Sequence, residues 1–94
     1  MFIILNAFSF LRKQLSEKGF AYLNAPMQLP DGISANGLIE HMGLEQKSIE
    51  AVFINHLVKP KETVLHNGDR VAFVPPGTPG SYRLMLGMKK VGED

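Results

Sequence analysis

The residue types that most often do chemistry are sparse in this chain and are not spaced for it. No two of the three histidines, His41, His56 and His66, stand at the i, i+4 spacing that lets one helix face hold a metal ion. The chain has no cysteine, which excludes disulfides, thiolate metal sites and a cysteine nucleophile. No serine stands in a Gly-x-Ser-x-Gly elbow near a histidine. We therefore expect no catalytic residue, no bound metal or other cofactor, and a fold that does not depend on metal.

Glycine and proline are concentrated in one short segment, Pro75-Pro76-Gly77-Thr78-Pro79-Gly80. This segment is not predicted to bind phosphate, because no Gly-Lys-Ser/Thr follows it and its three prolines lack amide donors. It is predicted to be a stiff, narrow arm with no large side chain before Tyr82. Such an arm could thread a channel in a partner protein or join the domain to one more structural element, and the residues leave both open.

Ahead of this arm the sequence indicates strands separated by turns. Asn67-Gly68-Asp69 comes directly before the apolar run Val71-Ala72-Phe73-Val74, and Asn-Gly most readily takes the positive φ angles of a tight turn. Pro75-Pro76 then removes two backbone donors, so the strand is expected to end there.

These residues resemble the small ubiquitin-like sulfur carriers of the MoaD/ThiS family, which act in molybdopterin, tungstopterin and thiamine biosynthesis. The resemblance covers about three quarters of the chain and is specific from about residue 43 to residue 76. It implies an α+β, ubiquitin-like β-grasp fold, with a mixed sheet of four to five strands packed on one main helix and an extra C-terminal segment. The family pattern Leu-x-x-Gly-Asp-x-Val-x-x-x-Pro-Pro is matched by Leu65, Gly68, Asp69, Val71, Pro75 and Pro76, its Asn-Gly-type turn by Asn55-His56, and its glycine tail by residues 77–80.

The first half of the chain supplies a strand, a short helix and a second strand. Residues 2–5 form an apolar run that suits a strand covered on both faces but would also suit a short buried helix. The resemblance implies that the run is the first, central strand. Apolar residues at helical spacing predict a turn or two of helix that ends at Gly19. Residues 20–29 are predicted to form a second strand, ended by the turn Pro30-Asp31-Gly32.

The second half supplies the main helix and the remaining strands. Ser34 is a suitable N-cap, Leu38, Ile39 and Met42 share one face of the helix that follows, and Gly43 ends it. Strands are predicted at residues 49–54 and 71–74, with a short edge pairing within residues 58–65 that is interrupted by proline.

Length and charge restrict the organisation of the chain and its partners. We expect its 94 residues to form one β-grasp domain, with a core at residues 1–76, the arm at 75–80 and an extension at 81–94. Ten basic against nine acidic residues give a formal charge of +1, so a nucleic-acid partner is not expected. The apolar N-terminus lacks a basic flank and is interrupted before Arg12, so neither a signal peptide nor a membrane span is predicted. A cytoplasmic location is expected.

The resemblance implies a sulfur-carrier mechanism in which this chain is a protein co-substrate and not an enzyme. The family's carriers end in Gly-Gly, whose terminal carboxylate is adenylated by an ATP-dependent E1-like activating enzyme and then converted to a thiocarboxylate. In this chain Gly80 corresponds to that terminus and Gly77, Thr78 and Pro79 to the arm, with proline replacing the penultimate glycine. Because residues 81–94 follow, a thiocarboxylate requires that a protease first removes them.

Partner proteins are expected to dock on an exposed face of the sheet. In the resembling family, the activating enzyme and a sulfur-accepting synthase subunit dock there, and we assign this role to Phe53, Leu57, Arg70 and Tyr82. Tyr82, Leu84, Leu86 and Met88 alternate along the extension. This pattern favours a strand that packs on its own domain, pairs with a sheet edge or is buried in a partner.

Two other functions compete with the carrier role. One is a non-carrier β-grasp module for protein–protein interaction, which docks through its sheet and tail on a metalloenzyme or its maturation factor. The other is an RNA-associated β-grasp domain, which the near-neutral charge disfavours.

Overall fold

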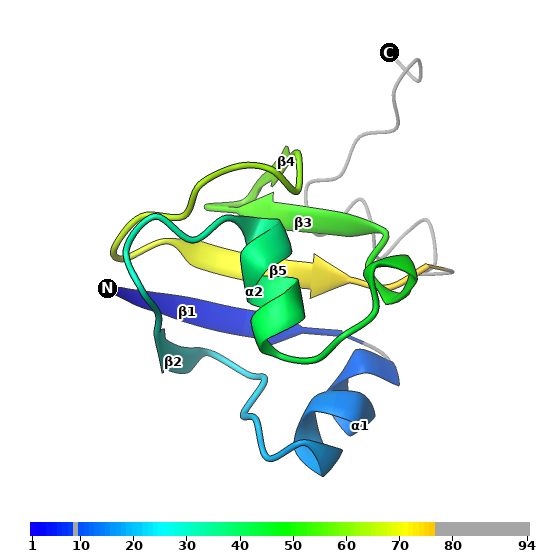
Figure 1. The fold of residues 1–94 in the computed structure, drawn as a ribbon. Helices are drawn as coiled ribbons and strands as arrows, with labels where there is room; N and C mark the ends of the chain where they lie inside the picture. The colour runs from blue at the N-terminus through cyan, green and yellow to red at the C-terminus, as the bar shows by residue number, and fades with distance from the viewer. Residues whose placement is uncertain (9, 77–94) are drawn as a thin grey trace, which may run out of the picture.

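The strands form one mixed sheet, and a helix packs across one of its faces (Figure 1). The structure is a computed structural model that describes residues 1–8 and 10–76. This α+β arrangement, with a mixed five-stranded sheet and one main helix, is the predicted one. The elements are β1 (Phe2–Ala7), α1 (Phe10–Glu17), β2 (Ala25–Gln28), α2 (Ala35–His41), a 3-10 helix (Gln46–Ser48), β3 (Ala51–Ile54), β4 (Leu57–Lys59) and β5 (Arg70–Val74).

The strand order is β2-β1-β5-β3-β4, so the last strand of the described residues lies in the middle of the sheet. β1 and β5 are parallel, from the pair Ile4 and Arg70 to the pair Ala7 and Phe73, and the other neighbours are antiparallel. β1 is therefore an interior strand, but the predicted central position belongs to β5. Burial alternates along β1, with only every second side chain fully buried, so the expectation of cover on both faces was wrong. Four consecutive apolar residues do not reveal whether the second face is covered.

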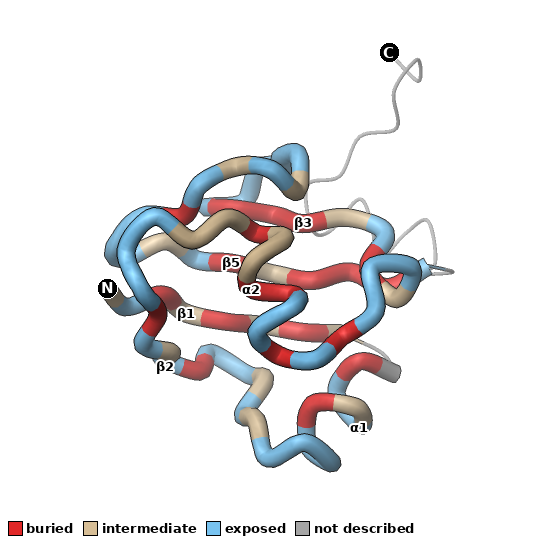
Figure 2. Tube along the Cα trace, viewed as in Figure 1, coloured by how far each residue is buried: buried red, intermediate tan, exposed pale blue. Residues whose placement is uncertain are grey.

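The main helix begins and ends where the sequence predicts. Ser34 Oγ accepts a hydrogen bond from the backbone N–H of Gly37 at 3.1 Å and caps the first turn of α2. Gly43, at φ +70°, ends the helical path. Leu38 and Ile39 are fully buried against the sheet, and Figure 2 shows the buried residues of α2 and of the strands behind it.

The low helix propensity of Gly37 is offset by the close packing that it allows inside α2. A Cβ at this position would come within 2.7 Å of Ile33 Cγ1. The glycine therefore lets the residue before the cap pack closely on the first helical turn, which offsets its cost of about 1 kcal/mol relative to alanine.

Two strands are shorter than predicted. β2 begins at Ala25, because Asn24 has a φ of +44° and bends the chain immediately before it, while Phe20 and Tyr22 pack on the core from a loop. β3 begins at Ala51, because the 3-10 helix occupies residues 46–48. In both places apolar residues contribute to the core without belonging to a strand.

Both turns indicated by the sequence are present, and they differ in backbone conformation. Asn55 and His56 have φ angles of 52° and 71° and form the two-residue connection between β3 and β4. At Asn67-Gly68 only the glycine has a positive φ, of 87°. Asn67 instead accepts a hydrogen bond at its Oδ1 from the backbone N–H of Phe2, at 2.8 Å.

Candidate functional site

The sheet has a second face, opposite α2, on which side chains from four strands form a continuous surface. We call it the open face. Residues paired across neighbouring strands point to the same side, so the register places Asn6, Ala72, Phe53 and Val58 in one row across β1, β5, β3 and β4. α2 crosses the other face in Figure 1, nearer the viewer, and the open face is turned away.

A small apolar cluster lies on the open face. Phe53 is 3% exposed and Val74 is 0% exposed, and they form a cluster separate from the main core. The partly buried hydrophobic side chains packed against them are those of Phe8, Ala51 and Ala72. This cluster lies where the chain leaves β5 and enters the arm.

Beside this cluster the open face is hollowed by a pocket of about 180 Å³. Its aromatic side chains provide apolar walls, and two asparagines, a histidine and an arginine provide hydrogen-bonding groups. A pocket of this composition suits one apolar or aromatic side chain that carries a polar end. It is lined by Asn6, Phe8, Asn24, Phe53, His56, Arg70, Val71 and Ala72.

A pair of asparagines is fixed in place on one side of the pocket. The backbone N–H of Asn24 donates to Asn6 Oδ1 at 2.9 Å, and Asn6 Nδ2 donates to Asn24 Oδ1 at 3.3 Å. This reciprocal pairing holds Asn24 in its positive-φ conformation and joins the loop before β2 to β1. The side chains are therefore largely preorganised before any ligand arrives.

On the other side, Asn55 and Asp69 join the β3–β4 turn to the start of β5. Asn55 Nδ2 donates to Asp69 Oδ1 at 2.9 Å, and Asn55 Oδ1 accepts from the backbone N–H of Arg70 at 3.0 Å. Asp69 Oδ2 accepts from the backbone N–H of His66 at 2.8 Å. The Gly-Asp part of the family motif thus has a structural role, because the Asp69 carboxylate holds the turns at Asn55 and His66 together.

The four predicted docking residues have different environments. Arg70 is exposed and lines the pocket. Phe53 lines it too, but only 3% of its surface is exposed. Leu57 is 60% exposed, yet its pairing with Ile54 places it on the α2 side of the sheet edge. Tyr82 lies outside the described residues, as do Gly77, Thr78, Pro79 and Gly80.

The open face also includes three residues that were not predicted to dock a partner. They are Val58 and the two pocket asparagines, Asn6 and Asn24. Val58 is 50% exposed and belongs to the open face through its pairing with Phe53. Alternation along Phe2–Ala7 could have put Asn6 on the open face once one side of β1 was assigned to the core. The pairing of Asn6 with Asn24 has no local sequence signal.

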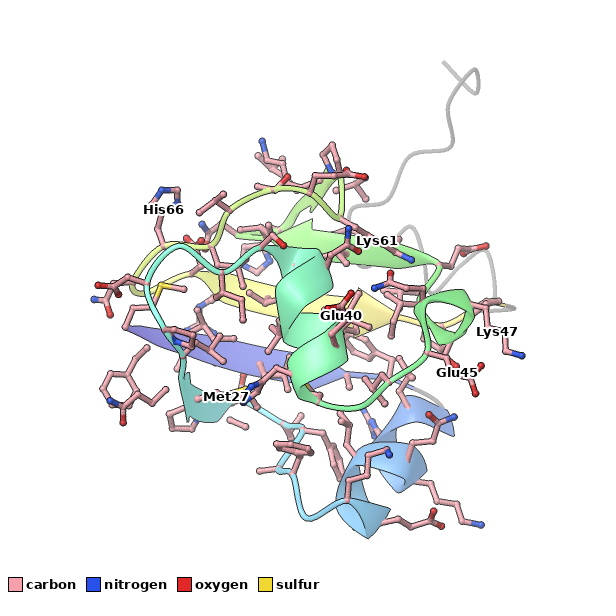
Figure 3. The ribbon with its side chains drawn as sticks, viewed as in Figure 1. Met27, Glu40, Glu45, Lys47, Lys61 and His66 are labelled. Atoms are coloured by element: carbon pink, nitrogen blue, oxygen red, sulfur yellow. The ribbon has the colours of Figure 1, made fainter. Side chains whose placement is uncertain are left out.

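Several charged side chains, labelled in Figure 3, lie on and around the α2 side of the sheet. Lys61 Nζ donates to the backbone carbonyl of Gln46 at 3.1 Å, and Lys47 forms an exposed ion pair with Glu45 at 3.2 Å. His66 projects from the loop before β5.

Within residues 1–8 and 10–76, no three histidine, aspartate or glutamate side chains are grouped so that they could hold a metal ion. None of the helices in these residues has the length and apolar character needed to cross a membrane.

Comparison with models of protein families finds a match over most of this chain. The model of the ThiS family matches residues 11–80. No curated protein sequence gives a significant match.

Solved structures share the fold at low sequence identity. The crystal structure of SAMP1 from Haloferax volcanii superimposes with a TM-score of 0.61 at 14% identity, covering 85% of this chain and 100% of that one. A second structure of small archaeal modifier protein 1 from the same organism gives 0.61 at 12% identity, covering 80% and 97%. A protein assigned as molybdopterin converting factor subunit 1 from Pyrococcus furiosus gives 0.59 at 19% identity, covering 81% and 98%. These likenesses establish the ubiquitin-like β-grasp fold.

Proposed function

This chain belongs to the ThiS family of small ubiquitin-like proteins, and from that premise we propose that it is a sulfur carrier whose working end is the carboxylate of Gly80. The observation that carries the proposal is the extent of the family match, which runs from residue 11 to residue 80 and ends at this glycine. The match thus runs from the first helix to the end of the arm.

In this role the protein is a co-substrate and not an enzyme. A protease hydrolyses the amide bond between Gly80 and Ser81, which leaves a carboxylate on Gly80. An ATP-dependent activating enzyme then joins this carboxylate to AMP and releases pyrophosphate. A sulfur nucleophile displaces AMP, so that one sulfur replaces one oxygen at the terminus.

In this proposal the reacting group and the docking surface belong to different parts of the chain. The arm follows directly from β5, the central strand, and Pro75 and Pro76 stiffen its beginning. We assign docking of the activating enzyme, and of the subunit that accepts the sulfur, to the open face and its pocket. A partner that binds there holds the root of the arm close to its own catalytic site.

Intact mass spectrometry of the protein recovered from its native host tests the proposal. We expect a species that lacks residues 81–94, part of which carries one sulfur in place of one oxygen. The Gly80→Pro variant should lack this species, because proline replaces the residue on the acyl side of the bond to be cut. Thr78→Ser, which changes the arm without altering its terminus, is the matched control and should retain it. Recovery of only the full-length, unmodified chain while the host's cofactor pathway is active would overturn the carrier role.

A non-carrier binding module is the second candidate, and a specific observation favours it. Pro79 stands where the family's carriers have a glycine, and its ring adds bulk and fixes φ in the part of the arm that enters the activating enzyme. Pro79→Gly, made in a protein that ends at Gly80 and so carries the free carboxylate, separates the two functions. A carrier should be adenylated at least as fast after the change, whereas a binding module should show no adenylation in either form.

A further inference from the structure

We infer that the pocket on the open face is a receptor for a carboxylate, which a partner protein supplies from a glutamate or aspartate beside an apolar side chain. The apolar side chain enters the pocket and the carboxylate pairs with Arg70. The preference for a carboxylate stands on the residues that line the pocket. The identity of the partner as the activating enzyme rests on the proposed function.

The ionisable side chains that line the pocket are hydrogen-bond donors. Arg70, which is exposed, and His56 line it, and no aspartate or glutamate is among the lining residues. A guanidinium has only donors, and its planar fork matches both oxygens of a carboxylate. An imidazole has a donor nitrogen in either protonation state. The polar end of a matching ligand is therefore an anion that accepts hydrogen bonds.

The guanidinium of Arg70 is left available by the rest of the fold. No ion pair between described residues includes Arg70. The adjacent carboxylate, that of Asp69, instead accepts from Asn55 Nδ2 and from the backbone N–H of His66. The backbone of Arg70 is fixed, because its N–H donates to Asn55 Oδ1 at 3.0 Å. Arg70 thus offers a charged side chain on an anchored backbone.

The asparagine pair adds a further donor. A backbone N–H can only donate, so the bond from the N–H of Asn24 fixes Oδ1 of Asn6 as its acceptor. Asn6 Nδ2 then faces Asn24 Oδ1 at 3.3 Å, which makes this oxygen an acceptor too. Both amide oxygens therefore have a donor. The Nδ2 group of Asn24 has no acceptor among the described residues and remains for a ligand.

A second guanidinium lies next to the pocket. Arg12 Cζ is 5.9 Å from the ring centroid of Phe8, which is one of the pocket walls, and 5.9 Å from that of Tyr22. Arg12 Nε donates to the backbone carbonyl of Ala7 at 3.1 Å. These contacts hold a second positive charge beside the pocket. Its field attracts an acidic segment of a partner and repels a basic one.

The walls of the pocket require an apolar group in the same ligand. Phe8 and Phe53 contribute ring surface, and Ala72 contributes a methyl group. A small inorganic anion would leave this apolar surface in water, whereas a purely apolar group would cover the donors without giving them an acceptor. A ligand that combines the two kinds of group satisfies both sets of side chains.

The surface around the pocket favours a protein as the source of this ligand. Val58 does not line the pocket, yet it belongs to the same row of the open face as Phe53 and Ala72 and is 50% exposed. A ligand that fills only the pocket leaves Val58 in water. A protein surface covers both at once, so the occupant to which we commit is an apolar and acidic patch of the activating enzyme.

Titration with hydrocinnamate, a phenyl ring joined to a carboxylate by a short alkyl chain, tests the pocket alone. Nuclear magnetic resonance of the full chain should show saturable shifts of the Phe53, Arg70 and Ala72 amides. The Kd should be on the order of millimolar, as for a detached fragment of a protein interface. Hydrocinnamamide, the uncharged amide of the same acid, should bind about tenfold more weakly.

Two variants assign the preference to one side chain. Arg70→Gln should remove it, so that the two probes bind equally. Lys59→Gln removes a positive charge from an exposed residue whose pairing with the buried Val52 places it on the α2 side, and should retain the preference.

Other outcomes of the titration overturn the inference. Absence of shifts, shifts outside the pocket or equal binding of the two probes to the unaltered protein would exclude a carboxylate receptor. Micromolar binding of hydrocinnamate would show that the ligand is a free carboxylic acid and not a protein.

The identity of the partner has its own readout. Arg70→Glu should weaken binding of the activating enzyme to the processed protein at least about tenfold, and the loss should shrink as the salt concentration rises. Lys59→Glu, the matched charge reversal, should change the affinity less than about twofold. Equal affinities for the two variants would overturn the assignment of the activating enzyme as the source of the carboxylate.

These results separate the inference from the carrier role. If the pocket prefers hydrocinnamate to its amide and the native protein never carries sulfur, the receptor stands and the carrier role fails. If sulfur is found on the native protein and the two probes bind equally, the carrier role stands and this inference fails.

Discussion

The two faces of the sheet use the same strands for different purposes. Toward α2, the strands present large side chains such as Leu5 and Phe73, which are fully buried in one cluster with residues of both helices. On the open face, the residues at the neighbouring positions Asn6 and Ala72 are small or polar and line a pocket. The first face stabilises the domain, and the second leaves room for another chain segment. A small domain can thus keep stability and docking on opposite sides of one sheet.

A matched pair of phenylalanines tests this difference most strongly. Phe73→Ala removes a fully buried ring from the α2 side and should lower the free energy of unfolding by about 3–5 kcal/mol. Phe53→Ala, on the open face, should cost about half as much, because its small separate cluster can collapse more easily. Urea unfolding of both variants measures the two values. Equal losses would show that the open face contributes as much to stability as the core.

The second prediction concerns the hydrogen bonds that hold both faces in register. Asp69→Ala removes the acceptor for His66 N–H and Asn55 Nδ2 and should cost about 1–2 kcal/mol. Glu62→Ala, at an exposed acidic residue of the preceding loop, should change stability by less than about 0.5 kcal/mol. In a double-mutant cycle, Asn55→Ala and Asp69→Ala should be non-additive. Additive losses would show that the two side chains act independently.

The third prediction separates docking from stability with two exposed valines. Val58 lies on the open face at 50% exposure, and Val64 lies in the loop that bridges to Ser34 at 45% exposure. Val58→Ser should weaken binding of the activating enzyme to the processed protein about tenfold, equivalent to about 1.4 kcal/mol. Val64→Ser should leave binding unchanged, and both should cost less than about 1 kcal/mol of stability. Titration calorimetry measures both affinities. Equal affinities for the two variants would show that the activating enzyme does not dock on the open face.

The smallest expected effect is that of a chelator. Because stability is assigned to apolar burial on the α2 side, ethylenediaminetetraacetate should leave the melting temperature unchanged within about 1 °C. Differential scanning calorimetry with and without the chelator makes the measurement. A decrease of several degrees would mean that a metal site contributes to the fold.

Local signals in the sequence were sufficient for the helix and for the family. Ser34 and Gly43 mark the two ends of α2 because capping depends on a few adjacent residues. The motif from Leu65 to Pro76 identified the fold because a turn, a strand and a proline stop follow one another directly.

The pocket could not be predicted in the same way, because it depends on contacts between distant residues. Asn6 meets Asn24, and Asn55 meets Asp69, only after the sheet has formed. The burial of Phe53 likewise could not be deduced from alternation, which assigns a side chain to a face but does not say what covers that face.

The middle position of β5 affects how the protein folds during synthesis. β1 with β2, and β3 with β4, are antiparallel pairs, and only β5 contacts both. Within residues 1–8 and 10–76, β5 is the last strand to be synthesised, so the nascent chain holds two separate pairs until Arg70–Val74 is available. Until then, the apolar Phe2-Ile3-Ile4-Leu5 run has one unpaired edge, which is a template for association with other chains. Folding is therefore completed late and depends on contacts of long sequence separation, which are the slow kind to form.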